Sequence, residues 1–487
     1  MLQADICQRA VHARDARFDG IFFVGITTTR VYCRPVCPAR VSYPDRRRFF
    51  DSAASAERAG YRPCLRCRPE LAPGRALMDA VPRLARLAAQ RIGAGALNGN
   101  SVADLARELG VSERHLRRAL ERELGVSPAE LAQTHRLLLA KRLLAETSLP
   151  VTRIAFASGF QSLRRFNSVF RERYRLSPSA LRRAAPSAAA PSAIPSGDFV
   201  TLTLAYRVPL DWGLVTGLLA REAMPGVIVV EGDRYGRTVS LDGRSGVVLA
   251  KNVAAKAQLD VAVSLSLLPV LMPLLVRLRH LFDLDAEPAV VDAYLEQNGL
   301  APLVRRRPGI RIPGALVGFE VALRSLLLGA NGGEEAASDL LLRVVCALGE
   351  EIDTGIPTLT RLAPSPERVA QAGPSGLAAL GMPRRVAEAI ASVARALAGG
   401  AIRLEPGRDA GATHRALMEM EGVGERLATM IVMRALYWPD AFPASDPALQ
   451  RAAGASSRSE LRAMAERWRP WRAYAAQHLW LHDEERR

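Results

Sequence analysis

The pattern of apolar and polar residues changes its period along the chain, and each change marks a different kind of secondary structure. Residues 199–206 alternate strictly, with an apolar side chain at every second position, which is typical of a strand buried on one face. Apolar runs at 227–230 and 247–249 continue the strand pattern, and a helix is expected at 212–222. The pattern therefore predicts a small α+β domain with an antiparallel sheet over residues 198–275.

Helical periodicity dominates residues 76–183, where one pattern occurs twice. An Ala-x3-Gly spacing at Ala106–Gly110 returns 49 residues later at Ala155–Gly159, and each copy continues with two apolar anchors and ends on Ser-Pro. Each copy predicts a helix, a glycine turn and a second helix, and a long helix at Pro128–Glu146 joins the two copies. The anchors are Leu116, Leu120, Phe166 and Phe170. The repeat predicts an all-α domain of two helix-turn-helix units.

The remaining segments follow from composition. Residues 184–197 are rich in Pro, Ala and Ser and contain no core-forming side chains, so they are expected to be a linker. From residue 276 onward the pattern is helical again. The longest uncharged run, 261–276, is too short for a bilayer span and contains prolines, so it is expected in a core. The predicted segments are a small α+β cysteine module at 1–75, the repeat at 76–183, the linker at 184–197, the sheet domain at 198–275 and an all-α domain at 276–487.

Charge is distributed unevenly between the two halves of the chain. The formal net charge is +17, and residues 1–197 hold 33 Lys and Arg against 16 Asp and Glu, whereas residues 198–487 hold 33 of each. A basic N-terminal half indicates a polyanionic partner, and nucleic acid is the partner that we expect. Residues 1–15 carry several charges and no apolar core, so no secretory signal and a cytoplasmic protein are expected.

Four of the six cysteines form two close pairs, Cys33 with Cys37 and Cys64 with Cys67. Spacings of C-x3-C and C-x2-C are typical of two loops that deliver four thiolates to one tetrahedral zinc ion. Disulfides would use the same residues, but nothing indicates an oxidising compartment. Six arginines flank the cysteines, either to offset the charge of the zinc site or to bind phosphate, and the basic flanking chain favours phosphate. They are Arg30, Arg34, Arg40, Arg62, Arg66 and Arg68.

The cysteine module resembles the N-terminal domain of the Ada adaptive-response proteins in its cysteine spacing and in its Cys-Arg-Pro and Arg-Pro-Cys sequences. The resemblance implies that Cys33 accepts a methyl group from methylated DNA phosphate. Zinc keeps a coordinated cysteine deprotonated, so its thiolate can attack the methyl carbon, and the thioether product makes the transfer stoichiometric. Methylation also removes one negative charge from the site. The family's contacts to the DNA backbone fall on Thr29, Arg40, Arg62 and Arg66.

The paired helix-turn-helix units resemble the AraC-type DNA-binding domain. Two units on one rigid helix would reach successive major-groove faces of a single site without dimerising. Outward residues of the two presumed recognition helices are then expected to contact DNA. These residues are Glu113, Arg114, Arg117 and Arg118 in the first unit, and Gln161, Ser162, Arg164 and Arg165 in the second.

A Gly-x-Gly turn at Gly422 and Gly424 lies between two predicted helices and indicates a helix-hairpin-helix. Free backbone N–H groups at the start of the second helix would bind a DNA phosphate without reading sequence. Asp446 follows this turn, and an Arg- and Trp-rich stretch lies at 467–480. Because the residue is flanked by Ser and Pro, Asp446 is also a good helix cap, and both roles are compatible.

With the sheet domain before it, this pattern resembles the AlkA-type alkylbase DNA glycosylases. The resemblance implies that Asp446 stabilises an oxocarbenium-like sugar while a damaged base leaves from a flipped nucleotide. Trp480 matches the aromatic side chain that stacks on the base, whereas Trp468 and Trp471 are expected in the core. No lysine follows Lys256, so a Schiff-base lyase step is excluded and a monofunctional glycosylase is predicted.

Several positions depart from the glycosylase pattern. Arg426 and Leu427 stand where the family has an aromatic-Thr pair, and Met430 replaces a pocket aromatic. Glu421 and Glu425 flank the turn that should hold phosphate. The wedge that fills the gap left by a flipped base corresponds to residues around Asn331, without a large apolar side chain. These departures leave open an inactive glycosylase-like half.

The predicted function is an adaptive response to DNA alkylation. Methylation of Cys33 would switch on sequence-specific transcription activation, and the C-terminal half would excise alkylated bases such as 3-methyladenine. One alternative is a methylation-sensing regulator with an inactive glycosylase-like half, and another is a purely structural zinc site. The expected cofactor is zinc. The expected partners are alkylated double-stranded DNA, promoter DNA and RNA polymerase, without a membrane.

Overall fold

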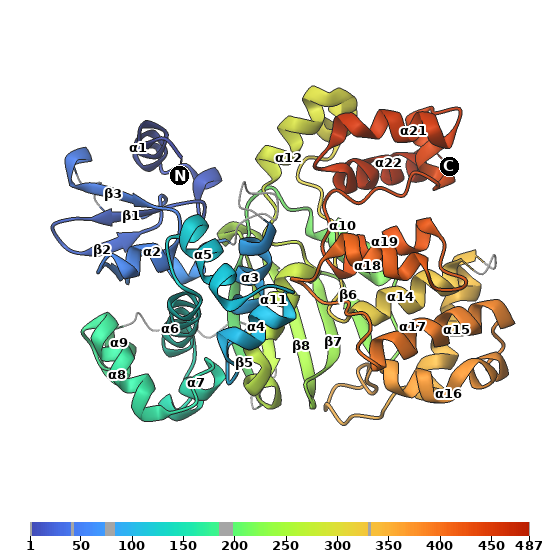
Figure 1. The fold of residues 1–487 in the computed structure, drawn as a ribbon, viewed down its shortest axis with the longest axis horizontal. Coiled ribbons are helices and arrows are strands. Elements are labelled where there is room, and N and C mark those ends of the chain that lie inside the picture. Colours follow the sequence, from blue (N-terminus) through green and yellow to red (C-terminus); the bar gives the residue numbers. More distant parts are fainter. Residues whose placement is uncertain (1, 40–42, 74–82, 185–197, 330–332, 487) are drawn as a thin grey trace. The chain divides into compact units, whose positions relative to one another are not determined.

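The computed structural model describes residues 2–39, 43–73, 83–184, 198–329 and 333–486. The chain divides into two compact units, Met1–Arg207 with Val253–Val276 and Val208–Asn252 with Arg277–Arg487. The multidomain architecture is confirmed: a small α+β module, a helical repeat, sheet strands and a helical region follow one another along the chain (Figure 1). Residues 185–197 of the expected linker lie outside the described residues, and the four boundaries between the five predicted segments stay predictions.

The cysteine module is a four-stranded sheet covered on both faces. The strands lie in the order β3-β1-β2-β4, with β1 antiparallel to β2 and β3, and β4 parallel to β2. Phe22 and Val24 pack under α1 on one face, whereas Phe23 packs near α2 on the other, so apolar residues are buried on both faces of the sheet. The elements are α1 (Ala4–Ala13), β1 (Phe23–Ile26), β2 (Val31–Cys33), β3 (Arg47–Phe50), α2 (Ala53–Arg58) and β4 (Arg62–Pro63).

The helical repeat forms two helix-turn-helix units, as predicted. Ser112 caps α5 in the first helix-turn-helix, and Ser162 caps α8 in the second. In each copy the capping serine follows a glycine of positive φ that ends the preceding helix. All four predicted anchors are fully buried. The joining helix α6 has the predicted bounds, Pro128–Glu146. The other helices are α3 (Arg83–Gly93), α4 (Val102–Glu108), α5 (Glu113–Leu124), α7 (Val151–Ala157), α8 (Leu163–Tyr174) and α9 (Pro178–Ala184).

The predicted strands of the sheet region are present in both units. In the first unit β5 (Phe199–Ala205) pairs antiparallel with β9 (Gln258–Ser264), and its burial alternates residue by residue, as its sequence predicted. In the second unit three consecutive antiparallel strands follow the predicted helix α10 (Trp212–Ala220). They are β6 (Ile228–Glu231), β7 (Arg234–Leu241) and β8 (Arg244–Val253). Among the described residues, no helix is both long and apolar enough to cross a bilayer.

Helices build most of the second unit. Helix α14 packs against α15, α17 and α19 around one apolar core, and α20 packs against α21 and α22 (Figure 1). The hairpin helices α18 and α19 lie against each other. Helix α11 (Leu271–Leu281) begins in the first unit and ends in the second. The other helices of the second unit are α12 (Pro288–Leu295), α13 (Ala301–Arg306), α14 (Gly318–Leu328), α15 (Gly333–Leu348), α16 (Pro366–Ala379), α17 (Arg384–Ala398), α18 (Ala410–Met418), α19 (Glu425–Ala435), α20 (Pro447–Ala453), α21 (Arg458–Ala465) and α22 (Arg472–Arg486).

Candidate functional sites

Four cysteine sulfurs meet at one end of the small sheet. Parallel pairing of β2 with β4 brings Cys33, at the end of β2, beside Cys64, which directly follows β4. Together with Cys37 and Cys67, their Sγ atoms all lie within 4.8 Å of one another. All six cysteines lie in the described part of the chain and are free thiols, so the disulfide alternative is wrong.

The chemistry of this donor set fits a metal ion. Hydrogen bonding in which the neutral Cys33 thiol is the donor, toward the sulfurs of Cys37, Cys64 and Cys67, raises the pKa of Cys33, and burial raises it further. Four crowded sulfurs therefore become thiolates together only when a cation balances their charge. Zinc takes four cysteine sulfurs in a closed tetrahedral site, and the protein uses this cluster to bind zinc.

The four sulfurs are not equivalent. Cys64 and Cys67 are buried, and their sulfurs accept hydrogen bonds at 3.4 Å from the backbone N–H groups of Arg66 and Arg34. The sulfur of Cys33 accepts no backbone hydrogen bond from any residue that the structure describes, and its residue is partly exposed. A hydrogen bond stabilises a thiolate and so lowers its reactivity. Cys33 is thus less protected than the two buried cysteines.

Two of the flanking arginines have structural partners. Arg34 donates from Nε to Asp19 Oδ1 at 2.8 Å, and Arg68 binds both Glu70 and Glu146, at 3.1 and 3.0 Å. These ion pairs are largely shielded from solvent, so Arg34 stabilises the module itself, and Arg68 also joins the module to the end of α6. The sequence could not separate them from arginines that are available to bind DNA.

The predicted contacts to the DNA backbone lie on the surface of the module. Thr29 and Arg66 are exposed and Arg62 is half-buried. Neither arginine forms an ion pair with any described residue, so both guanidinium groups remain available to a phosphate. Arg40 lies outside the described residues.

The helix that joins the two helix-turn-helix units touches the cysteine site directly. Lys141, in the middle of α6, is 2% exposed. Its Nζ donates to the main-chain oxygen of Cys64 at 3.3 Å and pairs with Glu70. Sequence reasoning missed this contact, although Lys141 is one of only three lysines and lies in an apolar stretch of helix. A zinc ligand and the DNA-reading domain therefore share one buried contact.

A second buried polar group ties the same two domains together. The carboxylate of Glu57, on α2, accepts hydrogen bonds from Tyr32 Oη at 3.1 Å and Thr134 Oγ1 at 3.0 Å. Arg173 of α8 lies 3.8 Å away. Burial raises the pKa of Glu57 to about 7, against the opposing effect of Arg173. Because Tyr32 precedes Cys33, this cluster links the strand of the acceptor cysteine to both α6 and α8.

The predicted outward residues of α5 and α8 divide into free and engaged groups. Glu113 and Arg117 pair with each other, with Nε 2.9 Å from the carboxylate. Ser162 caps α8 and accepts from the backbone of Arg165 at 3.3 Å, so its hydroxyl is already used. The residues that are exposed and have no part in these contacts through their side chains are Arg114, Arg118, Gln161, Arg164 and Arg165. These five are the side chains best placed for DNA.

The two glycines of the hairpin have different roles. Gly422 has φ +81°, and a Cβ there would lie 2.7 Å from Ala389 Cβ, so the fold requires glycine. Gly424 begins α19 with φ −78°, and a Cβ there would meet no atom within 4 Å. The start of α19 thus has no side-chain cap and an open approach, as an anion site requires.

Glu425, one of the two acids expected to oppose phosphate binding, is neutralised by its surroundings. Its carboxylate pairs with Arg458 and, at 2.9 Å, with Arg462, both from α21. The second acid, Glu421, is exposed. The ion pairs place two arginines beside the hairpin, so the local charge is more favourable to phosphate than the sequence indicated.

Asp446 is buried and engaged through both carboxylate oxygens. Its Oδ1 accepts from the backbone of Ala448 at 2.9 Å and so caps α20. Its Oδ2 accepts from Arg426 Nε, also at 2.9 Å. The predicted capping role is confirmed, and the departure at Arg426 turns out to contact the predicted catalytic residue.

The structure supports some of the remaining predictions for the base pocket of the glycosylase half and not others. Trp480 on α22 and Met430 on α19 are both partly exposed, and no described contact joins either to Asp446. Trp468 and Trp471 are buried in the core, as predicted. Residues 330–332, which include Asn331, lie outside the described residues.

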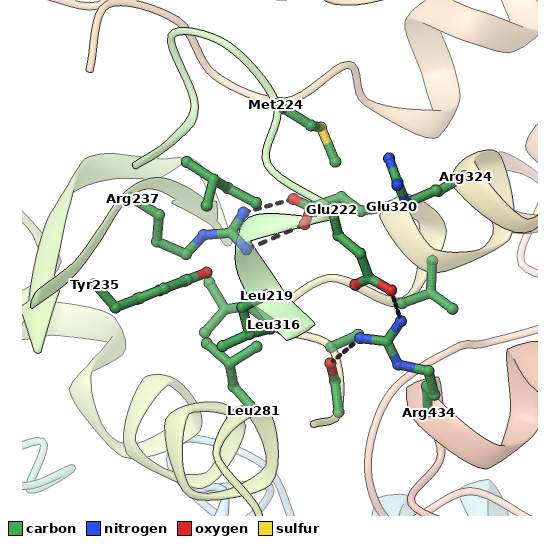
Figure 2. Close-up of a pocket in the computed structure, with 14 residues that line it drawn as sticks. Leu219, Glu222, Met224, Tyr235, Arg237, Leu281, Leu316, Glu320, Arg324 and Arg434 are labelled. Atoms are coloured by element: carbon green, nitrogen blue, oxygen red, sulfur yellow. Dashed lines mark hydrogen bonds and ion pairs between the residues drawn. The ribbon is translucent and has the colours of Figure 1, made fainter. Parts of the chain in front are cut away.

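A further pocket lies among β7, α10, α14 and α19, and sequence reasoning did not find it (Figure 2). Four of its charged groups form two ion pairs, Arg237 with Glu320 at 2.6 and 3.1 Å and Arg434 with Glu222, whereas Arg324 lies 3.6 Å from Glu334, which does not line the pocket. None of its lining residues is a predicted site residue. Because four of its five charged groups form ion pairs within the pocket and Arg324 donates to the main-chain oxygen of Arg221, we assign it to the packing of the unit.

Three family models match separate stretches of the chain. The metal binding domain of Ada matches residues 6–70, a helix-turn-helix domain matches residues 105–184, and the AlkA N-terminal domain matches residues 201–317. The order of the three matches is that of the cysteine module, the repeat and the sheet strands.

Curated relatives match the whole chain or one of its halves. The probable bifunctional transcriptional activator/DNA repair enzyme AlkA of Mycobacterium tuberculosis is 38% identical over 483 residues, 97% of this chain and 95% of the relative. DNA-3-methyladenine glycosylase 2 of Escherichia coli is 33% identical, over 57% of this chain and 96% of its own. The bifunctional transcriptional activator/DNA repair enzyme Ada of Escherichia coli is 31% identical, over 30% of this chain and 40% of its own. Among solved structures, 3-methyladenine DNA-glycosylase from Archaeoglobus fulgidus aligns with TM-score 0.49 and 21% identity, over 58% of this chain and 98% of that one.

Proposed function

Because the chain belongs to the family of bifunctional transcriptional activator/DNA repair enzymes AlkA, we propose which of its residues perform the two activities. The protein is a methylation-responsive transcriptional activator with a DNA glycosylase half. In our proposal Cys33 accepts a methyl group from DNA methylphosphotriesters. Asp446 serves the excision of alkylated bases such as 3-methyladenine.

Of the two partly exposed cysteines, Cys37 accepts a backbone hydrogen bond from Ala39, so the surroundings of the sulfurs and the position in the Ada-type motif both favour Cys33. Its sulfur lacks the backbone hydrogen bonds that stabilise the buried pair, and its residue is partly exposed. Bound zinc would keep the four sulfurs deprotonated at neutral pH. The Cys33 thiolate attacks the methyl carbon, the carbon–oxygen bond breaks, and its electron pair stays on the phosphate oxygen, which restores the phosphodiester charge.

The consequence for DNA binding is electrostatic. A methylated Cys33 carries a neutral thioether, so the site facing DNA loses one negative charge. Thr29, Arg62 and Arg66 support this proposal as surface donors to phosphate, and Arg40 is included from the family pattern. The exposed arginines of α5 and α8 then read the promoter. RNA polymerase is the partner that an activator of this kind would recruit.

In the second half, Asp446 would stabilise positive charge on the deoxyribose as the base leaves. The backbone at Gly422 and Gly424 would hold a phosphate, and Trp480 and Met430 would line the base pocket. Support comes from the buried position of Asp446 at the start of α20, which the hairpin helix α19 contacts through Arg426.

Two assays on the full-length zinc protein test these assignments. Incubation with DNA that contains methylphosphotriesters should add one methyl mass to the peptide of Cys33, and Cys33→Ala should remove it. A methyl found on another cysteine would overturn the assignment, and no methyl on a protein that retains zinc would indicate a purely structural zinc site.

Alkylated DNA should also release 3-methyladenine in a reaction that Asp446→Asn abolishes. Equal release by the two proteins would indicate an inactive glycosylase-like half. The methyl transfer assay would be unaffected by that outcome, so the two parts of the proposal fail separately.

A further inference from the structure

One buried carboxylate holds elements of both the cysteine module and the helical repeat. Glu57 lies on α2 of the module and is 2% exposed. Its carboxylate binds β2 through the hydroxyl of Tyr32, α6 through the hydroxyl of Thr134, and α8 through Arg173, whose Nη1 lies 3.8 Å away. Because a buried charge that loses a partner is strongly destabilising, the three elements keep fixed positions around this carboxylate.

Helix α2 is also anchored in the first helix-turn-helix unit. Ala54, one turn before Glu57, is buried in the apolar core around Leu120. Arg58, the residue after Glu57, donates to the main-chain oxygen of Gly125 at the end of α5. One short helix therefore joins the cysteine module to both helix-turn-helix units, to the first by apolar packing and to the second through the Glu57 carboxylate.

The second helix-turn-helix unit is attached at the far end of its presumed recognition helix. Arg173 lies in the last turn of α8, and the same helix contacts β4, the strand that begins with Arg62. Arg164 and Arg165, which we propose read the promoter, lie in the first turn, about 12–14 Å away along the helix axis. Because Glu57 holds the other end of α8, the base-reading end has a fixed position relative to the module.

DNA sets a strict geometric requirement for a reader of this kind. One base pair adds about 3.4 Å along the DNA axis and rotates the next groove face by about 35°, since roughly ten base pairs complete a turn. A protein whose two contact surfaces are fixed relative to each other cannot follow an inserted base pair. By contrast, a protein with a mobile joint between the two surfaces can bind both parts of the lengthened site.

We propose that Glu57 fixes the spacing, along a promoter, between the phosphates that the cysteine module binds and the bases that α8 reads. This inference rests on the proposed DNA contacts of Arg62 and Arg66 in the module and of Arg164 and Arg165 in α8. Because its side chain is buried, Glu57 contacts no DNA and acts as a positioning residue. It determines which spacing of the site the activator accepts.

The test measures how promoter affinity responds to the length of the site. The full-length zinc protein first selects a duplex from a random-sequence pool. Footprints of Arg66→Ala and Arg165→Ala then identify the parts of the site that lose protection at the module and at α8, and one base pair is inserted between these parts. Binding is measured at pH 8, above the pKa of about 7 that burial gives Glu57, so that the carboxylate is charged.

The wild-type protein should lose about tenfold or more in affinity on the insertion, because one of its two contact surfaces no longer reaches the DNA. Glu57→Gln keeps the size of the side chain but removes the charge that holds Arg173, so the loss should shrink to about threefold or less. Arg173→Gln should act in the same way from the α8 side. Arg171→Gln is the matched control, since it removes an exposed positive charge from the same turn and should keep the wild-type loss.

Equal losses on insertion in wild type and in both variants would overturn the inference, and so would a wild-type protein that binds the two duplexes alike. Zinc content shows whether Glu57→Gln is folded, and if it loses zinc, the partly exposed Arg173 decides through Arg173→Gln. If Arg62→Ala and Arg66→Ala leave affinity and footprint unchanged, the proposed phosphate contacts fail and this inference fails with them. If they weaken binding but Arg173→Gln keeps the wild-type spacing dependence, only the inference fails.

Discussion

Lys141 donates a hydrogen bond from Nζ to the main-chain oxygen of Cys64 at 3.3 Å, and so the middle of α6 contacts a zinc ligand. The same ammonium group pairs with the buried Glu70. A buried ion pair contributes little to the stability of the fold when it is intact, but the loss of one partner leaves a buried charge uncompensated and is strongly destabilising. The contact is therefore a sensitive point of the N-terminal unit.

Lys141→Met should destabilise this unit by about 3 kcal/mol, because among the described residues Arg68 would be the one ion-pair partner left to Glu70. The measurement is denaturant-induced zinc release, followed with a metal indicator, since the zinc site belongs to this unit. Lys256→Met is the matched control, because Lys256 is exposed. Release of zinc at the same denaturant concentration in both variants would show that the buried contact contributes nothing.

Removal of zinc with a chelator should abolish methyl transfer and lower the stability of the N-terminal unit. Without the ion, four sulfurs within 4.8 Å of one another cannot all carry negative charge. Methyl uptake by mass and unfolding by circular dichroism check this expectation, and added zinc should restore both. Full methyl uptake by the zinc-free protein would contradict it.

The second unit should show a pH dependence that originates at Asp283. This carboxyl group is fully buried among Tyr437, Tyr474 and the backbone of Ile312. Burial raises its pKa from 3.8 to about 6, although the nearby Arg311 acts in the opposite direction. Between about pH 4 and pH 6 the folded state holds a proton that the unfolded state releases, so stability falls as the pH rises through this window.

Asp283→Asn should remove this slope. The free energy of unfolding of wild type minus that of the variant should fall by up to ~3 kcal/mol between pH 4 and pH 6. All five tryptophans lie in the second unit, so their fluorescence during urea unfolding reports on this unit. Burial lowers the pKa of His280 to about 4, an effect of opposite sign that is present in both proteins and cancels. Parallel pH profiles would contradict the assignment.

The two hairpin glycines should respond differently to alanine. Gly422→Ala should destabilise the second unit by about 1–2 kcal/mol or more, because φ is positive and the new methyl group meets Ala389. Gly424→Ala should change stability little, since φ is negative and the space is open, but it should raise the KM for base release several-fold by hindering the phosphate. Melting by tryptophan fluorescence and base-release kinetics measure the two effects. Equal melting of the two variants would contradict the distinction.

Much of the architecture could be predicted from local signals. The bounds of α6, the two helix-turn-helix units and the alternation in β5 follow from periodicity and from residues such as Ser127 and Pro128 at helix starts. The C-x3-C and C-x2-C spacing of the four cysteines also predicted a shared metal site, because few other structures require cysteines at this spacing. Sequence patterns of this type involve only a few neighbouring residues, so they can be recognised without knowledge of the fold.

Partnerships between distant charges could not be predicted in the same way. Many arginines have similar sequence surroundings, yet Arg34 and Arg68 form ion pairs with buried acids while Arg66 is free of ion pairs with the described residues. Glu425 was expected to repel phosphate, but α21 supplies two arginines to it. Which acidic side chain pairs with which basic side chain depends on how helices that are far apart in sequence pack against each other.

The sequence by itself determined the order of the domains, the zinc ligands and the candidate Asp446, because periodicity, cysteine spacing and helix-start residues are local chemistry. Only the tertiary structure decided that Lys141 contacts the ligand Cys64, and that Arg426 lies 2.9 Å from Asp446. The physical reason is that electrostatic and hydrogen-bond energies depend on distance and burial. Both quantities are set when α6 packs against the cysteine module and when α19 meets the start of α20.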